Sequence, residues 1–106
     1  HVWIGEKVWI DNLAKVTLKS NSCVSPGALI LCGNHNYRKT TFDLIVGEIT
    51  LEEGAWVGAM ATVCPGVRVG SHSLLTVGSV ATKSLEAYWI YQGNPAQKLK
   101  IREIKA

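Results

Sequence analysis

Long apolar runs, paired cysteines and a strong excess of charge are all missing from this chain of 106 residues. No stretch approaches the roughly 20 consecutive apolar residues that cross a bilayer, so no membrane-spanning segment is expected. Charged residues make up 18% and hydrophobic residues 47%, a balance that is typical of a folded protein and argues against disorder. At this length the sequence predicts a single domain over residues 1–106 with one modest core.

The cysteines and the charges argue against a disulfide-linked fold, a metal site and a nucleic-acid-binding protein. Cys23, Cys32 and Cys64 are odd in number and include no C-x-x-C pair, which favours free thiols in a reducing compartment, the cytoplasm. No metal is expected. The net charge is +3, and no basic patch interleaved with aromatic residues is present, so nucleic acid is not an expected partner. A basic tail is ordinarily a solvent-exposed surface, and the more specific alternative is a binding site for a polyanionic cofactor. The tail contains Lys98, Lys100, Arg102 and Lys105.

What the chain does have is an internal repeat of six residues. From residue 51 it divides into LEEGAW, VGAMAT, VCPGVR, VGSHSL and LTVGSV, with an aliphatic first position and a small or branched fifth position. IGEKVW and IDNLAK, followed after an offset by LKSNSC and VSPGAL, obey the same rule in the first half. Such a period fits neither an amphipathic helix nor an alternating strand.

The repeat predicts an all-β fold, a parallel β-helix in which each unit forms one side of a triangular prism. The first and fifth positions point inward, and glycine and polar residues occupy the corners, where backbone torsions are unusual. Successive coils pair as parallel strands about 4.8 Å apart. The period does not choose the hand of the coil.

Two segments break the repeat. Residues 32–49 contain turn residues and charges, and we expect a loop ejected from one corner, where functional residues are often found. Residues 93–106 begin with a Gly-Asn-Pro turn, and we expect one or two helical turns there that pack Leu99, Ile101 and Ile104 against the prism.

Six motifs together resemble the hexapeptide-repeat acyltransferase superfamily, most closely the sugar O-acetyltransferases of the galactoside, maltose and exopolysaccharide types. The resemblance implies a left-handed coil, a homotrimer with active sites between subunits, acetyl-coenzyme A as the acyl donor, and a small-molecule acceptor. Family members have a longer N-terminal region, so a fragment or a minimal version is expected. The motifs are VWIG at 2–5, VWIDNLAKV at 8–16, CGNHNY at 32–37, WVGAMATVCPGVRVG at 56–70, VGSVATK at 77–83 and GNPA at 93–96.

The same resemblance assigns the general base to the loop histidine, His35. A neutral imidazole can take the proton of an acceptor hydroxyl as the hydroxyl attacks the thioester carbonyl, which typically contributes about 10²–10⁴-fold in rate. A solvated loop histidine is the plain alternative. A covalent mechanism through Cys32 would require an exposed thiol of low pKa, and a packing role is the preferred interpretation of that residue. His72 is interpreted as a structural corner residue.

The resemblance also places residues around the two substrates. Backbone amides near Ala59 and Val77 would bind pantetheine, and Trp56 would form an apolar wall, unless it packs between subunits. Thr82, Lys83 and Lys100 would lie near the phosphates. For the acceptor the resemblance implies Asp11, Asn12, Asn34 and Tyr37.

Some observations favour a second class, a trimeric β-helix scaffold without catalytic activity. The GNPA motif is commonly followed by arginine, and Gln97 stands there instead, so we expect either weaker phosphate binding or a reliance on Lys98. The intact loop histidine and the Thr82-Lys83 pair favour the enzyme. A carbonic anhydrase of the same fold is rejected, because its zinc site needs three histidines and this repeat region has only His35 and His72.

Overall fold

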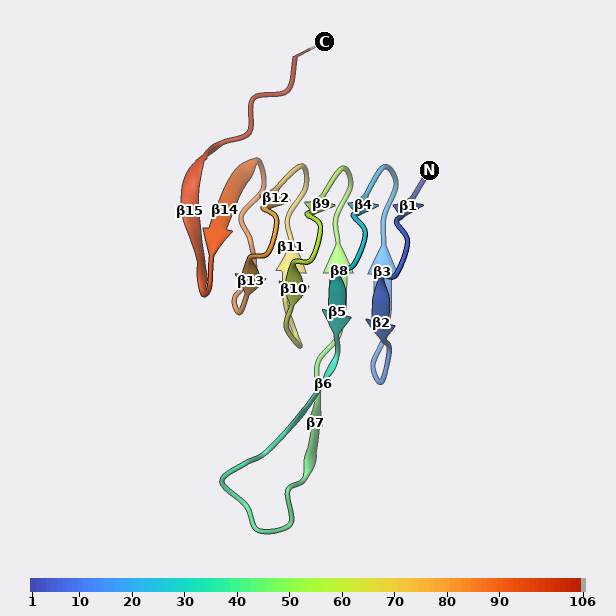
Figure 1. Cartoon of the computed structure of the whole chain (residues 1–106), viewed down its shortest axis with the longest axis vertical. Coiled ribbons are helices and arrows are strands. Elements are labelled where there is room, and N and C mark those ends of the chain that lie inside the picture. Colours follow the sequence, from blue (N-terminus) through green and yellow to red (C-terminus); the bar gives the residue numbers. More distant parts are fainter. Residues whose placement is uncertain (106) are drawn as a thin grey trace.

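The computed structural model describes residues 1–105, and they form a triangular prism of short parallel strands with one arm that projects from it (Figure 1). Residue 106 of the predicted tail lies outside the described part. The first face contains β1 (Trp3–Ile4), β4 (Cys23–Val24), β9 (Trp56–Val57), β12 (Leu74–Leu75) and β14 (Trp89–Gly93). The second face contains β2 (Trp9–Asp11), β5 (Leu29–Leu31), β10 (Thr62–Val63) and β13 (Val80–Ala81). The third face contains β3 (Val16–Leu18), β8 (Ile49–Leu51) and β11 (Arg68–Val69).

The core is the one that the repeat predicts. The residues at the first position from the second coil onward are 0% exposed. Those at the fifth position are small and almost fully buried, because three sides converge there and leave little volume. The first set is Val24, Ile30, Leu51, Val57, Val63, Val69 and Leu75; the second is Ala28, Ala55, Ala61, Val67, Ser73 and Ser79.

One corner column shows how closely the coils stack. Asn21, Gly54, His72 and Tyr88 occupy equivalent turns between the third and first faces, all with a positive φ. An added Cβ at Gly54 would lie 2.2 Å from the His72 ring, so only glycine leaves room for that side chain.

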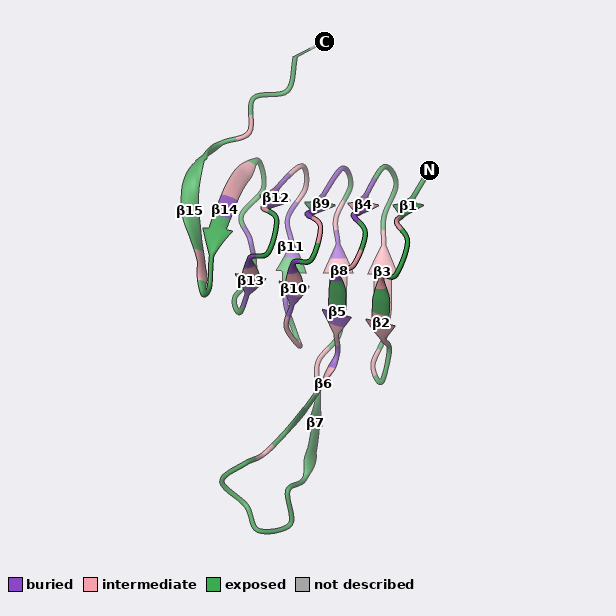
Figure 2. Ribbon diagram, viewed as in Figure 1, coloured by how far each residue is buried: buried purple, intermediate pink, exposed green. Residues whose placement is uncertain are grey.

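The protruding loop is confirmed, and it is more ordered than expected. Its two sides form an antiparallel pair, β6 (Gly33–His35) and β7 (Leu44–Val46), which leaves the prism between β5 and β8. The register pairs His35 with Leu44. We call residues 33–46 the arm. Figure 2 shows most of it exposed, whereas the buried residues gather in the prism.

The expectation of helical turns in the tail was wrong. β15 (Ala96–Ile101) runs antiparallel to β14 and extends the first face. Leu99, Ile101 and Ile104 are 53%, 52% and 54% exposed, so they do not pack on the prism as expected. The physical reason is the unpaired edge of β14: once the turn reverses the chain, the tail satisfies those backbone groups more completely than a short isolated helix could. Residues 1–105 contain no helix that could span a membrane.

Candidate functional site

His35 lies at the end of β6, where the arm begins its turn, and its ring is held on two sides. Its Nδ1 is 3.0 Å from the backbone carbonyl oxygen of Phe42. Its ring stacks on the Phe42 ring, with centroids 4.3 Å apart and 7° between the planes. Because a carbonyl oxygen only accepts hydrogen bonds, Nδ1 must carry the proton, and Nε2 of the neutral ring is then the free acceptor.

The asparagines beside His35 shape the arm. The side-chain oxygen of Asn34 accepts a 2.8 Å bond from the His35 backbone N–H. The side-chain oxygen of Asn36 accepts a 3.1 Å bond from the N–H of Arg38, which is an Asx-type turn. Both asparagine side chains bond to the backbone of the arm, and the contact that sets the tautomer of His35 is the Phe42 carbonyl.

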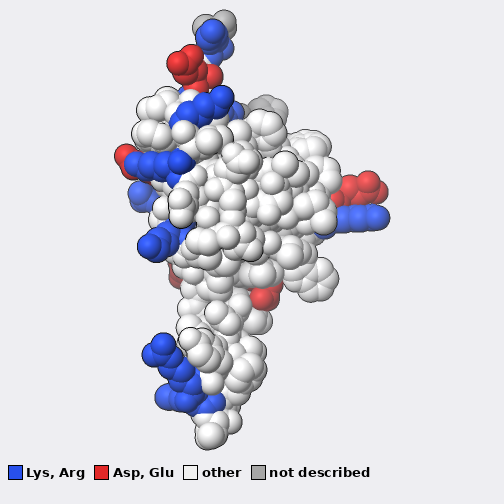
Figure 3. All heavy atoms as spheres, turned by 60° about the vertical axis from the view of Figure 1, so that its left-hand side comes forward, with Lys and Arg blue, Asp and Glu red and all other residues white. Residues whose placement is uncertain are grey.

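The tip of the arm is aromatic and basic. Tyr37 is 78% exposed, and the Arg38 guanidinium lies 5.8 Å from the centroid of its ring. Lys39 forms an exposed ion pair with Asp43 at 3.3 Å. Figure 3 shows the resulting basic cluster at the end of the arm, far from the broad uncharged face of the prism. The predicted acceptor residue Tyr37 is therefore accessible, and positive charge lies beside it.

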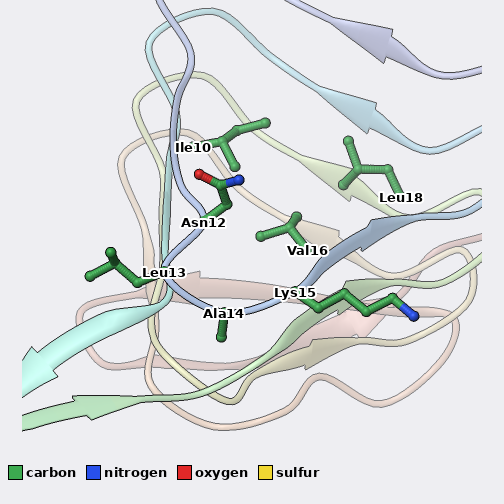
Figure 4. A pocket seen from close by; sticks show the side chains of 7 residues that line it. All are labelled: Ile10, Asn12, Leu13, Ala14, Lys15, Val16 and Leu18. Atoms are coloured by element: carbon green, nitrogen blue, oxygen red, sulfur yellow. The ribbon is translucent and has the colours of Figure 1, made fainter.

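Asp11 and Asn12, predicted near the acceptor, lie at the root of the arm and at the N-terminal end of the prism. The Asp11 carbonyl accepts a bond from the Cys32 N–H at 3.1 Å, and Oδ2 of Asp11 would lie 3.1 Å from a Cβ added at Gly33. Asn12 lines a hollow of about 550 Å³ at the open end of the first coils. Figure 4 shows Ile10, Val16 and Leu18 pointing into it. Only Asp11 is thereby brought beside the strand that carries His35.

Ala59 and Val77, predicted to bind pantetheine, occupy neighbouring turns between the first and second faces. The N–H of Gly78 bonds to the Ala59 carbonyl at 2.9 Å, which ties the two turns together. Within residues 1–105 the backbone N–H groups of Ala59 and Val77 donate no hydrogen bond. Two free donors, flanked by small or exposed side chains, are what an extended ligand with amide carbonyls requires.

Trp56 lies on the first face beside this corner. Its indole N–H donates a 2.8 Å bond to the Ser25 hydroxyl, and its side chain remains 39% exposed. Arg102 lies 5.8 Å from the centroid of the indole ring and donates to the carbonyls of Gly54 and His72 at 3.1 and 3.2 Å. Ser25 thus holds the indole by a hydrogen bond, and Arg102 of the tail lies beside its ring.

The predicted phosphate residues are divided between two faces. Thr82 and Lys83 follow β13 on the second face and are exposed. Lys100 lies on β15 opposite Ile90, on the first face. Lys98, the predicted substitute for a missing arginine, bonds to the Glu86 carboxylate and lies 4.5 Å from the Trp89 ring centroid. That hydrogen bond raises the pKa of Lys98. Its charge is already paired, so it is a poor substitute.

The three cysteines are free, and their surroundings separate them. Cys32 is 0% exposed, which makes it inaccessible as a nucleophile and supports the packing role. Burial raises the pKa of the Cys64 thiol, which keeps it protonated and unreactive. No group of three or more potential metal ligands occurs within the described residues.

Within one chain these residues do not converge on one pocket. His35, Asn34 and Tyr37 lie on the arm, whereas Ala59, Val77 and Trp56 lie at a corner of the prism. The sequence analysis missed Phe42 and Arg102, which orient His35 and Trp56. Phe42 is the only phenylalanine of the chain, and its position in a polar segment was the available signal.

Known proteins resemble this chain both in sequence and in fold. No family model matches the chain. It is 28% identical over 102 residues to the "Putative colanic acid biosynthesis acetyltransferase WcaF" of Escherichia coli (strain K12), a match that covers 96% of this chain and 56% of WcaF. The chain therefore spans little more than half the length of that relative.

Solved structures share the fold. The D94N mutant of AntD, an N-acyltransferase from Bacillus cereus in complex with dTDP and coenzyme A, superposes with a TM-score of 0.90 at 17% identity, covering 97% of this chain and 62% of AntD. The hexapeptide-repeat acetyltransferase VCA0836 of Vibrio cholerae, complexed with acetyl-coenzyme A, gives 0.86 at 21% identity, covering 97% and 61%. These superpositions fix the hand of the prism as left.

Proposed function

We propose that this chain, which resembles the hexapeptide-repeat acyltransferases in sequence and has their left-handed β-helix, transfers an acetyl group from acetyl-coenzyme A to a hydroxyl of a small acceptor, with a sugar as the expected class. The observation that carries the proposal is the state of His35: its Nδ1 is bonded to a carbonyl at 3.0 Å, so Nε2 is the nitrogen left to accept a proton.

The reaction follows from that nitrogen. Nε2 of His35 accepts the proton of the acceptor hydroxyl while the hydroxyl oxygen attacks the thioester carbonyl carbon. Backbone N–H donors stabilise the oxyanion that forms. Collapse breaks the carbon–sulfur bond, the thiolate leaves, and the proton held by His35 passes to it, so that the products are the acetyl ester and free coenzyme A.

The donor fits the corner of the prism that carries Ala59 and Val77. Their unbonded N–H groups would bind the pantetheine amides, and Trp56 would cover the chain with its exposed face. Thr82, Lys83 and Lys100 would contact the phosphates; within residues 1–105 neither lysine forms an ion pair. Asp11, Asn12, Asn34 and Tyr37 remain our candidates for the acceptor.

A homotrimer in the cytoplasm is part of the proposal. Residues that point outward from the first and second faces form ladders that are apolar except for Thr62, whereas the third face carries the ion pairs of Glu52 with Lys19 and Arg68. Two apolar faces allow each subunit to contact two others, and the arm of one subunit would then reach the donor corner of the next. Three free thiols favour a reducing compartment. The ladders are Trp3, Cys23, Trp56, Leu74 and Ile90, and Trp9, Leu29, Thr62 and Val80.

A trimeric scaffold is the second candidate, favoured by the pairing of Lys98 with Glu86 and by Gln97. Thermal unfolding with acetyl-coenzyme A separates the two. A ligand that binds only the folded state stabilises it by about 2.7 kcal/mol at 100 times its dissociation constant. An unchanged melting temperature at millimolar ligand supports the scaffold and contradicts the enzyme.

The test of the activity is release of free thiol from acetyl-coenzyme A with sugars, amino sugars, serine and chloramphenicol as acceptors. We expect release that depends on a hydroxyl acceptor. Release with amino sugars alone, retained when their hydroxyls are blocked, would instead make the enzyme an N-acyltransferase.

Lys83→Met tests the donor site. Removal of the charge should weaken acetyl-coenzyme A binding at low salt and flatten its salt dependence, because a lysine near phosphate acts through a screened Coulomb attraction. Lys19→Met, which removes the same charge from the third face, is the control. Equal dissociation constants for Lys83→Met and the unaltered chain would remove Lys83 from the site.

A further inference from the structure

Phe42 makes both of the contacts that fix the His35 ring, and it does so from an uncommon backbone conformation. Its φ is 52°, in the left-handed region that bulky side chains seldom occupy. The Phe42 N–H bonds to the Lys39 carbonyl at 3.0 Å, and the Asn36 N–H bonds to the Asp43 carbonyl at 2.8 Å, so the turn is closed on both sides of it. Strained residues that the surroundings hold in this way are concentrated at functional sites.

The two contacts restrict different motions. The 3.0 Å bond from Nδ1 to the Phe42 carbonyl fixes which edge of the imidazole faces the turn. The stacked ring, with 7° between the planes, restricts rotation of the imidazole about its bond to Cβ. A hydrogen bond alone leaves the plane free to swing, and stacking alone allows the ring to flip. Together they aim Nε2 in one direction.

Core packing does not account for the Phe42 side chain. It is 54% exposed and does not belong to the hydrophobic cluster of the prism. An aromatic ring that gains little from burial and adopts a strained φ requires another explanation, and its close ring contact is with His35.

We propose that Phe42 is a positioning residue: its left-handed backbone presents the carbonyl to Nδ1 of His35 while its ring stacks on the imidazole, so that one residue sets the tautomer and the plane of the general base. This inference rests on the proposed function of His35. Misplacement of a reacting group by about 1 Å costs on the order of 100-fold in rate, so this orientation is worth fixing.

Two variants separate the ring from the backbone. Phe42→Asn keeps a residue that tolerates positive φ, and therefore keeps the carbonyl in place, but it removes the ring. Phe42→Tyr keeps the ring. Tyr88→Asn is the matched control, because Tyr88 is another aromatic residue of positive φ, 68°, stacked on a histidine, His72, at a corner of the prism.

The first readout does not depend on activity. Nitrogen-15 chemical shifts report the tautomer of each imidazole, and the chain has only three histidines, which a His35→Gln spectrum assigns. We expect Nδ1–H for His35 in the unaltered chain, in Phe42→Tyr and in Tyr88→Asn. In Phe42→Asn the carbonyl remains, but without the stacked ring the imidazole can swing out of line with it, so the hydrogen bond should form only part of the time. The two nitrogen signals should then approach each other as both tautomers become populated. A His35 signal unchanged in Phe42→Asn would overturn the role of the ring.

The second readout is turnover. We expect kcat to fall about 10- to 100-fold in Phe42→Asn, with the dissociation constant of acetyl-coenzyme A unchanged, and to remain near normal in Phe42→Tyr and Tyr88→Asn. An equal loss in Phe42→Tyr would contradict the proposal, since the ring is retained there. If the unaltered chain transfers no acyl group, the proposed function fails, while the nitrogen shifts still decide whether Phe42 sets the tautomer.

Discussion

Two histidines of this chain are stacked on an aromatic ring, and their surroundings give them different uses. His35 lies on the arm, exposed, with Nδ1 bonded to the Phe42 carbonyl. His72 lies in a corner column, half-buried between Gly54 of one coil and Tyr88 of the next. The centroids of the His72 and Tyr88 rings are 5.0 Å apart, with 29° between the ring planes. The same side chain is a candidate base where the chain leaves the repeat and a spacer between coils where the repeat continues.

The difference extends from these residues to the regions that carry them. The prism is built from side chains that the stacked coils bury, so its residues are fixed by packing. The arm has almost no buried side chain, and local hydrogen bonds and one stacked pair hold its form. Changes to His35 and its contacts in the arm should therefore affect chemistry, and changes in the buried core of the prism should affect stability.

The largest expected effect is on turnover. His35→Ala should lower kcat by about 10²–10⁴-fold, because the proton of the acceptor hydroxyl loses its acceptor. His72→Ala should leave the kcat of the folded protein nearly unchanged. Thiol release from acetyl-coenzyme A measures kcat in both variants. Comparable losses of kcat in the two variants would contradict a specific catalytic role for His35.

The next largest effect is on stability. Leu51→Ala removes a side chain that is 0% exposed and should cost about 2–5 kcal/mol of the free energy of unfolding. Leu44→Ala on the arm, where the side chain is 54% exposed, should cost less than about 0.5 kcal/mol. Denaturant unfolding measures both values. A large cost for Leu44→Ala would show that the arm is packed in the assembled protein.

A smaller effect tests the column itself. Gly54→Ala should destabilise the protein by about 2–3 kcal/mol, because the new methyl group meets the His72 ring and φ is 68°. Gly66→Ala is the control, with a φ of 80° and no atom within 4 Å of the added Cβ, and only the backbone cost of about 1–2 kcal/mol applies. Part of the Gly54→Ala loss should be recovered when His72→Ala is added. No recovery would mean that His72 is not the obstacle.

The smallest effect concerns charge. Lys39→Met breaks the exposed ion pair with Asp43 on the arm and should change stability by less than about 0.5 kcal/mol. Glu52→Gln on the third face should cost more, about 1 kcal/mol, because its side chain is only 17% exposed and pairs with both Lys19 and Arg68. Melting temperatures of both variants and of the unaltered chain, at low and at high salt, provide the comparison. Equal changes in melting temperature for Lys39→Met and Glu52→Gln would contradict the expected difference.

The tail shows why part of the fold could not be predicted. Residues 98–105 are rich in lysine, arginine and isoleucine, which suits a helix as well as a strand. The unpaired edge of β14 decides between them, and that edge exists only once the prism has formed. The same pairing brings Lys98 to Glu86, which removes a charge that the sequence alone had offered for phosphate binding.

By itself, the sequence determined the prism. An aliphatic residue at every sixth position, with a small residue between, predicts a three-sided coil that buries both sets, and both are buried in the structure. The hand of the coil is not contained in this period. The tertiary structure alone decided which edge of His35 faces the turn, what holds Trp56, and whether the predicted site residues meet within one chain. Those outcomes depend on contacts with Phe42, Arg102 and the edge of β14, and a repeat of six residues carries no information about contacts outside the repeat.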